Sequence, residues 1–125
     1  MRLKSPSSFF GRGKKVKIIV TGGRFYKNYS KVVEILDDLK PSFIIQGGCS
    51  GADSLAVAYS EENKIKYKTY EANWSEYGSI AGPIRNKKML EENLDAVLVA
   101  FPGGRGTVNC VKTAQELGLK VIFVS

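Results

Sequence analysis

The hydrophobic positions of the chain follow two spacings in alternation. Short apolar or alternating runs, typical of strands, lie at residues 16–21, 43–46, 65–70, 96–101 and 121–124. Between them apolar residues recur with helical spacing, as at Val32, Ile35, Leu36 and Leu39 in the segment 29–39. The pattern therefore predicts strand and helix in alternation.

The remaining predicted helices begin near residues 52, 83 and 107. Pro83 suits a first helical turn, and Gly118 is the expected C-cap of the last helix. Residues 71–82 are predicted to be a long connection, and residues 65–70 a strand near a sheet edge. About five strands separated by helices imply a three-layer, doubly wound α/β fold of the Rossmann-like kind, with a parallel sheet.

Three glycine-rich stretches each follow a predicted strand and precede a helix: TGGR at 21–24, QGGCSGAD at 46–53 and PGGRGT at 102–107. In a parallel sheet such loops meet at one edge, where ligands bind. Glycines let backbone N–H groups approach a small ligand, and a helix start adds further free N–H groups. The loops predict one shared anion site, for a phosphate; the alternative is that the glycines only make tight turns.

The composition suits one domain, because 125 residues that are 43% hydrophobic supply one core. Neither a membrane span nor a secretory signal is recognisable, which predicts a soluble cytoplasmic protein without a membrane partner. The net charge of +7 lies mostly in residues 1–15, with five basic and no acidic side chains; residues 16–125 carry 14 basic and 12 acidic ones. Residues 1–15 are thus a basic, flexible tail or a phosphate-contacting arm, and residues 16–125 the domain.

The chain contains no histidine, which excludes a Ser-His-Asp or Cys-His mechanism within it. Cys49 and Cys110 are too few and too far apart to suggest a disulfide framework or a zinc site, so no metal is expected. Cys49 is interpreted as a small neutral wall residue of its loop, because no histidine is present to activate it.

Three arginines, Arg24, Arg85 and Arg105, belong to independent segments that should face the same crevice. Guanidinium groups pair with phosphate in bidentate fashion, so these side chains suit a ligand with several phosphates, or with one phosphate and a carboxylate. The alternative for each arginine is an ion pair with a carboxylate across the site.

Two carboxylates and several flat side chains complete the candidates. Asp53 suits an N-cap or first-turn role in its helix, or a hydrogen bond to a ribose hydroxyl. Glu71 is either an acid or base at the loop edge or an exposed surface residue. Trp74 and Tyr77 are candidates for stacking on a base, with ordinary burial as the alternative. Asn73 or Asn86 could read the edge of that base.

Four motifs together resemble the SLOG superfamily of Rossmann-like domains, in particular its YspA-like branch: TGGR at 21–24, GGCSGADSLA at 47–56, the ANW…YG…AGPIRN stretch at 72–86 and AFPGGRGT at 100–107. The resemblance covers nearly everything after Lys15. It implies a domain whose glycine loops bind nucleotides or nucleotide-derived molecules. Relatives include LOG phosphoribohydrolases, molybdenum cofactor carriers, the single-strand-binding DprA domain and sensors of cyclic ADP-ribose signals, and they often form homo-oligomers.

LOG enzymes are similar to this chain at Arg85 and Met89 and in the motif PGGxGTxxE, whose glutamate is catalytic. That glutamate position is Cys110 here, a weak substitute for a carboxylate in N-glycosidic cleavage, and Asn109 cannot take a proton. The expected ligand-binding residues are Thr21, Gly22, Gly23, Arg24, Gly47, Gly48, Ser50, Gly51, Asp53, Trp74, Arg85, Asn86, Pro102, Gly103, Gly104, Arg105, Gly106 and Thr107.

Three functions follow from these residues. The first is a module that binds a nucleotide-derived small molecule as sensor, carrier or sequestering protein. The second is a hydrolase of nucleoside monophosphates that uses Glu71 or Asp53 together with Arg85. The third is a single-strand nucleic-acid binder that uses the basic tail and the loop arginines, and it ranks last because residues 16–125 are nearly neutral.

Overall fold

The structure, a computed structural model, describes residues 15–125, so the predicted basic tail lies outside the described residues except for Lys15. Five strands form one parallel sheet in the order β3-β2-β1-β4-β5. The strands are β1 (Lys17–Thr21), β2 (Phe43–Gln46), β3 (Lys66–Thr69), β4 (Val97–Ala100) and β5 (Lys120–Phe123). The helices are α1 (Tyr29–Leu39), α2 (Ala52–Glu62), α3 (Trp74–Tyr77), α4 (Ala81–Glu91) and α5 (Arg105–Glu116), with a short 3₁₀ helix, η2, at Gly78–Ile80.

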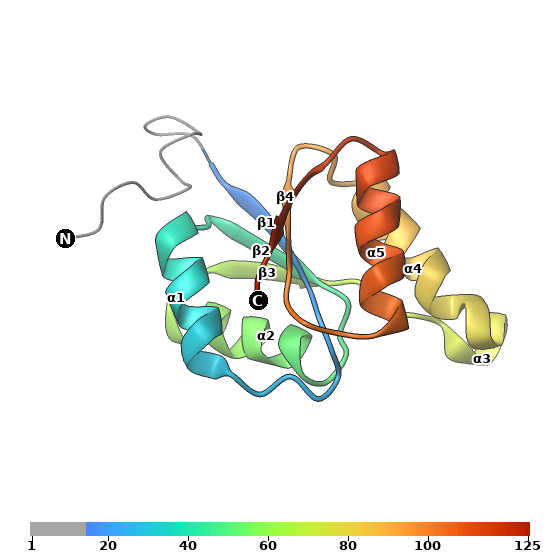
Figure 1. Cartoon of the computed structure of the whole chain (residues 1–125), viewed down its shortest axis with the longest axis horizontal. Coiled ribbons are helices and arrows are strands. Elements are labelled where there is room, and N and C mark those ends of the chain that lie inside the picture. The colour runs from blue at the N-terminus through green and yellow to red at the C-terminus, as the bar shows by residue number, and fades with distance from the viewer. Residues whose placement is uncertain (1–14) are drawn as a thin grey trace.

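Helices α1 and α2 cover one face of the sheet, and α4 and α5 cover the other (Figure 1). The central strand β1 serves both cores, because Ile18 and Val20 pack beneath α1 and α2 whereas Ile19 packs beneath α4 and α5. All three side chains are at most 1% exposed. The three-layer Rossmann-like fold predicted from the sequence is confirmed, and burial of β1 on both faces explains its lack of alternating polarity.

The strand order reverses between β1 and β4. From β1 the chain proceeds through β2 to the edge strand β3, and it then crosses to β4 on the other side of β1. The loops after β1 and β4 are therefore neighbours, and the N–H of Gly23 donates to the carbonyl oxygen of Pro102 at 2.9 Å. Such a reversal leaves a crevice at the carboxyl ends of the strands, and ligands of α/β sheets bind there.

The segment after β3 differs from the predicted long connection, because it contains α3 and η2. Asn73 caps α3 by accepting a hydrogen bond from the N–H of Glu76 at 3.1 Å, a local signal that the sequence interpretation missed. Helix α4 begins at Ala81, before the predicted Pro83, and ends at Glu91. Pro83 is the third residue of α4, still within the first turn, where a missing N–H breaks no helical hydrogen bond.

The edge strands are more exposed than the central ones. All four residues of β3 are exposed, which confirms the predicted position of that strand near an edge of the sheet. None of the helices within residues 15–125 is long and apolar enough to cross a membrane.

Candidate functional site

A cavity of about 910 Å³ opens at the carboxyl ends of the strands, between the loops after β1, β2 and β4 and the segment from α3 to α4. Most of the predicted ligand-binding residues line it. They are Thr21, Gly22, Gly23, Arg24, Gly47, Asp53, Trp74, Arg85, Asn86, Pro102, Gly103, Gly104, Arg105, Gly106 and Thr107. The structure thus brings the three glycine loops to one cavity.

Six predicted candidates lie outside this lining: Gly48, Ser50, Gly51, Glu71, Asn73 and Tyr77. Gly51 is the N-cap of α2 with φ of 78°, and a Cβ there would come within 2.1 Å of the carbonyl oxygen of Gly23. This glycine is required by close packing of two loops and by a left-handed backbone. Glu71 is exposed at the end of β3, near Gly48, so this acid or base candidate does not border the cavity.

The loop after β1 is packed between the other two glycine loops. A Cβ on Gly22 would lie 2.6 Å from Cβ of Ala52 and 2.9 Å from Cβ of Phe101. The carbonyl oxygen of Gly23 accepts hydrogen bonds from the N–H groups of Ala52, at 3.1 Å, and Tyr26, at 3.2 Å. Gly22 is packed against two side chains and Gly23 against the backbone of the loop after β4, so close packing explains these two glycines without a ligand.

The loop after β2 uses its own side chains to satisfy its backbone. Oδ2 of Asp53 accepts hydrogen bonds from the N–H groups of Gly47 and Cys49, both at 3.1 Å. Oε1 of Gln46 accepts from the N–H of Gly48 at 2.6 Å, and Nε2 of Gln46 donates to Oγ1 of Thr69. The N–H groups of residues 47–49 are thereby all occupied, so they are not available to bind an anion.

Asp53 is the only acidic side chain among the described residues that line the cavity. It is 6% exposed, and burial is the main reason why its pKa rises from 3.8 to about 6. The hydrogen bonds from Cys49 and Gly47 and the positive charge of Arg85 oppose that rise in pKa. Asp53 therefore lies in the first turn of α2, where its Oδ2 holds the preceding loop, and the N-cap of the helix is Gly51.

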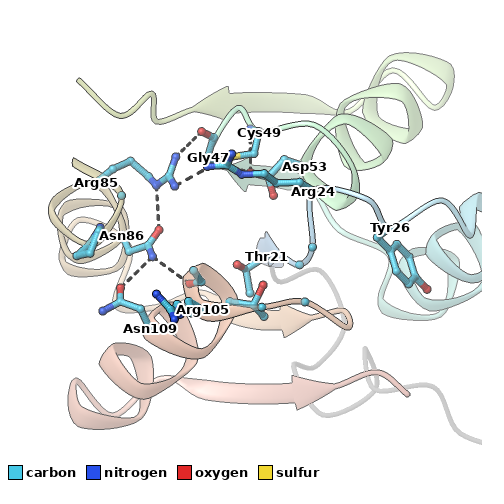
Figure 2. A pocket seen from close by; sticks show the side chains of 18 of the residues that line it. Thr21, Arg24, Tyr26, Gly47, Cys49, Asp53, Arg85, Asn86, Arg105 and Asn109 are labelled. Atoms are coloured by element: carbon cyan, nitrogen blue, oxygen red, sulfur yellow. Dashed lines mark hydrogen bonds between the residues drawn. The ribbon is translucent and has the colours of Figure 1, made fainter. Parts of the chain in front are cut away.

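Arg85 joins α4 to the loop after β2 (Figure 2). Its Nη1 donates to the carbonyl oxygens of Gly47, at 2.5 Å, and Tyr70, at 3.3 Å, while its Nε donates to Oδ1 of Asn86 at 2.9 Å. These bonds leave mainly Nη2, which lies 3.9 Å from Sγ of Cys49. The arginine thus holds the cavity wall together through hydrogen bonds to carbonyl groups. The alternative expected from the sequence was an ion pair with a carboxylate.

Asn86 extends this bracing to α5. Its Nδ2 donates to Oδ1 of Asn109 at 3.0 Å and to the carbonyl oxygen of Gly106 at 3.3 Å. Asn86 is 4% exposed, and its amide oxygen is already the acceptor for Arg85. One continuous polar network therefore fixes the loop after β2, α4 and the start of α5 relative to one another (Figure 2).

The start of α5 is open in comparison. The first helical bond runs from the N–H of Val108 to the carbonyl oxygen of Gly104 at 3.0 Å, so the N–H groups of residues 105–107 precede it. No side chain caps this helix, and its first turn contains no acid. A Cβ on Gly104 or on Gly106 would meet nothing within 4 Å.

Two exposed arginines line the same cavity, Arg105 at the start of α5 and Arg24 next to the loop after β2. Their guanidinium groups make no hydrogen bond or ion pair with other described residues. Because their guanidinium groups have no protein partner within residues 15–125, they are available for an anion. Of the three predicted phosphate-binding arginines, the structure leaves these two free and uses Arg85 for bracing.

Cys110, at the position where the resemblance to LOG enzymes implies a glutamate, is fully buried beneath the cavity. Burial raises the pKa of its thiol to about 11, against a hydrogen bond with Thr21 and the charge of Arg85, which both lower that pKa. The side chain is therefore a protonated part of the core under α5. Within residues 15–125 no group of three or more Cys, Asp or Glu side chains is placed to hold a metal ion.

Several lining residues were missed by the sequence interpretation as ligand-binding candidates. They are Val20, Phe25, Tyr26, Ser79, Gly82, Pro83, Met89 and Asn109, while Cys49 lines the cavity as the expected wall residue. Phe25 is 88% exposed at the cavity, and Tyr26 packs against Phe101 with ring centroids 5.2 Å apart. Both aromatic residues directly follow the TGGR motif, and this position is a sequence signal that identifies them as candidates for lining the site. Trp74 is 48% exposed, so ordinary burial does not explain it.

The fold and the cavity define a Rossmann-like domain with its site where the strand order reverses. A family model described as the YspA, cpYpsA-related SLOG family matches residues 16–77. The chain is also 33% identical to the Gene 61 protein of Mycobacterium phage D29 over 118 residues, which cover 85% of this chain and 94% of the phage protein. The chain belongs to the YspA, cpYpsA-related SLOG family, whose membership supports a nucleotide-related, ligand-binding Rossmann-like module.

Proposed function

We propose that this protein binds a phosphorylated nucleoside or a related nucleotide-derived molecule in the cavity, as a sensor, carrier or sequestering module. The observation that carries the proposal is the open start of α5. Its free N–H groups at residues 105–107 and the two unpartnered arginines, Arg24 and Arg105, border the same cavity of about 910 Å³. Helix starts with adjacent arginines bind phosphate groups through the helix dipole and bidentate hydrogen bonds.

The base and sugar would occupy the rest of the cavity. Trp74 and Phe25 expose aromatic surface to it from two different segments, and aromatic rings stack on bases of any identity. A cavity of about 910 Å³ lies within the range, roughly 300–1,000 Å³, of small-molecule sites in proteins. The size and lining of the cavity therefore suit a phosphorylated nucleoside or a related nucleotide-derived molecule.

A binding role is favoured over N-glycoside hydrolysis by the positions of the acids. The LOG glutamate is replaced by a buried, protonated cysteine, and Glu71 lies outside the cavity lining. Asp53 borders the cavity, but one of its oxygens is committed to the loop backbone. Self-association and single-strand binding by the basic tail remain predictions from the sequence.

The first test is mass spectrometry of small molecules released by denaturing the purified protein, followed by incubation of the released molecule with fresh protein. We expect an intact phosphorylated nucleoside derivative, and a rise in melting temperature when it is added back, because a ligand of the native state stabilises it. Release of free base over time would favour the hydrolase. If no nucleotide is released and none in a panel raises the melting temperature, the proposal is wrong and single-stranded DNA is tested next.

A further inference from the structure

Asp53 presents one carboxylate oxygen to the backbone and leaves the other without a partner. Oδ2 accepts from the N–H groups of Gly47 and Cys49 at 3.1 Å each, whereas Oδ1 has no hydrogen-bond donor among the described residues. The residue is 94% buried, being 6% exposed. Because the described residues contain no fully buried side-chain oxygen without a partner, Oδ1 must be reached from the cavity that Asp53 lines.

The chemistry of a carboxylate decides which ligand group it can take. An ionised carboxylate only accepts hydrogen bonds, so a ligand group that pairs with Oδ1 must be a donor such as a hydroxyl. A phosphate beside it would be repelled by the carboxylate charge. The phosphate is thereby directed away from Asp53, to Arg105 and the free N–H groups at the start of α5, which line the same cavity.

We propose that Asp53 forms a sugar-hydroxyl subsite, so that the cavity selects ligands that carry both a phosphate and a free ribose hydroxyl. This inference rests on the proposed function and deepens it. The bound ligand would be oriented with its phosphate at α5 and its ribose hydroxyls at α2. The loop after β2, despite its glycines, is a sugar site and not a second phosphate site, because Asp53 and Gln46 occupy the N–H groups of residues 47–49.

The test measures, by calorimetry or by melting temperature at a pH above the pKa of Asp53, the binding of four nucleoside 5′-monophosphates and their 2′-deoxy and 3′-deoxy counterparts. We expect at least one deoxy series to bind about tenfold or more weakly, the loss expected when a hydroxyl that pairs with a charged group is removed. In Asp53→Asn the ribo and deoxy ligands should bind within about threefold of each other, because the charged acceptor is gone. Glu71→Gln is the matched control, because it removes a carboxylate outside the cavity lining and should keep the preference of the wild type.

Three results would overturn the inference. If the wild type binds ribo and deoxy ligands equally, no hydroxyl is recognised, and this comparison needs no variant that folds. If Asp53→Asn keeps the preference for ribose, another group reads the hydroxyl. If Asp53→Asn changes the choice of base and leaves the ribose preference intact, Oδ1 pairs with a base amino group instead. Failure of every phosphorylated ligand to bind would contradict the proposed function itself and is thus distinguishable.

Discussion

Two glycine-rich loops of this protein resemble each other in sequence but differ in what their backbones bind. The loop after β2 has its N–H groups at residues 47–49 occupied by Gln46 and Asp53. The loop after β4 has neither an internal acceptor nor a cap, and the N–H groups of residues 105–107 stay free. Glycine content alone does not distinguish the two loops. The difference is that the helix after the first loop begins with a carboxylate, Asp53, which accepts hydrogen bonds from the N–H groups of that loop.

The same contrast holds for the arginines. Arg85 donates hydrogen bonds to the carbonyl groups of Gly47 and Tyr70 and to the side chain of Asn86. The guanidinium groups of Arg24 and Arg105 have no partner among the described residues. The loop after β2 is thus held by protein–protein hydrogen bonds, whereas the N–H groups at the start of α5 and the guanidinium groups of Arg24 and Arg105 are left open for a ligand.

The glycines of the two loops should give the largest difference in stability. In Gly51→Ala the new Cβ meets the carbonyl oxygen of Gly23 at 2.1 Å in a left-handed backbone, and we expect a loss of about 2–5 kcal/mol in the free energy of unfolding. In Gly106→Ala the new Cβ meets nothing within 4 Å and α5 gains helix propensity, so stability should rise by up to about 1 kcal/mol. Urea denaturation of both variants measures the difference. Equal losses would contradict the contrast between a packed and an open loop.

The two kinds of arginine should separate stability from binding. Arg85→Ala leaves buried acceptors at Gly47 and Asn86 unpaired and should lower the free energy of unfolding by about 1–3 kcal/mol. Arg105→Ala should change stability by less than about 0.5 kcal/mol and weaken phosphate-dependent binding about tenfold. Urea denaturation and calorimetry with a nucleoside monophosphate check the two effects.

The opposite result would be that Arg105→Ala destabilises the protein and Arg85→Ala affects only ligand binding. That result would contradict the structural role given to Arg85 and the ligand-binding role given to Arg105. Lys27→Ala serves as the control for charge, because it removes an exposed cation that does not line the cavity and should affect neither quantity.

The buried carboxylate of the α2 loop should give stability an unusual pH dependence. The folded protein raises the pKa of Asp53 from 3.8 to about 6, so between these values the native state keeps a proton that the unfolded state has lost. Its contribution is therefore most favourable below about pH 4 and is lost as the pH rises through about 6, a change of about 2–3 kcal/mol. The difference in unfolding free energy between wild type and Asp53→Asn, measured from about pH 4 to 7, should fall over this range. A rise with pH would mean that hydrogen bonds outweigh burial.

The cysteines should show the smallest effect, a difference in reactivity. Cys49 in the α2 loop is partly exposed, whereas Cys110 in α5 is fully buried with the pKa of its thiol raised to about 11. A disulfide reagent should therefore modify Cys49 in the native protein and Cys110 only after unfolding, as a mass spectrum of the peptides would show. Cys49→Ser should remove the fast reaction, and persistence of that reaction would place Cys110 in an open environment.

Local signals carried much of the prediction. The helical spacing of apolar residues gave the range of α1, and the apolar run of β2 gave its limits, because both patterns depend on neighbours in the chain. The three glycine loops were predicted to meet because parallel topology brings all such loops to one edge. The helices between residues 74 and 80 were missed because each is too short for its periodicity to be visible.

Other features depended on contacts between distant residues. The partner of Arg85 lies 38 positions away at Gly47, and no spacing rule identifies a carbonyl group as its acceptor. Likewise, Glu71 follows β3 as predicted, but it does not line the cavity. Strand β3 lies at the edge of the sheet, and whether a residue after it reaches the cavity depends on tertiary packing.

The sequence by itself determined the alternation of strands and helices, the family, and the three loops that border the site, because each is encoded in residue order over short distances. Only the tertiary structure decided which glycine loop is filled and which is open, which arginines are free, and that Cys110 is buried in the core. Those outcomes depend on which donors and acceptors meet across the fold, and hydrogen-bond partners far apart in the chain are selected by packing.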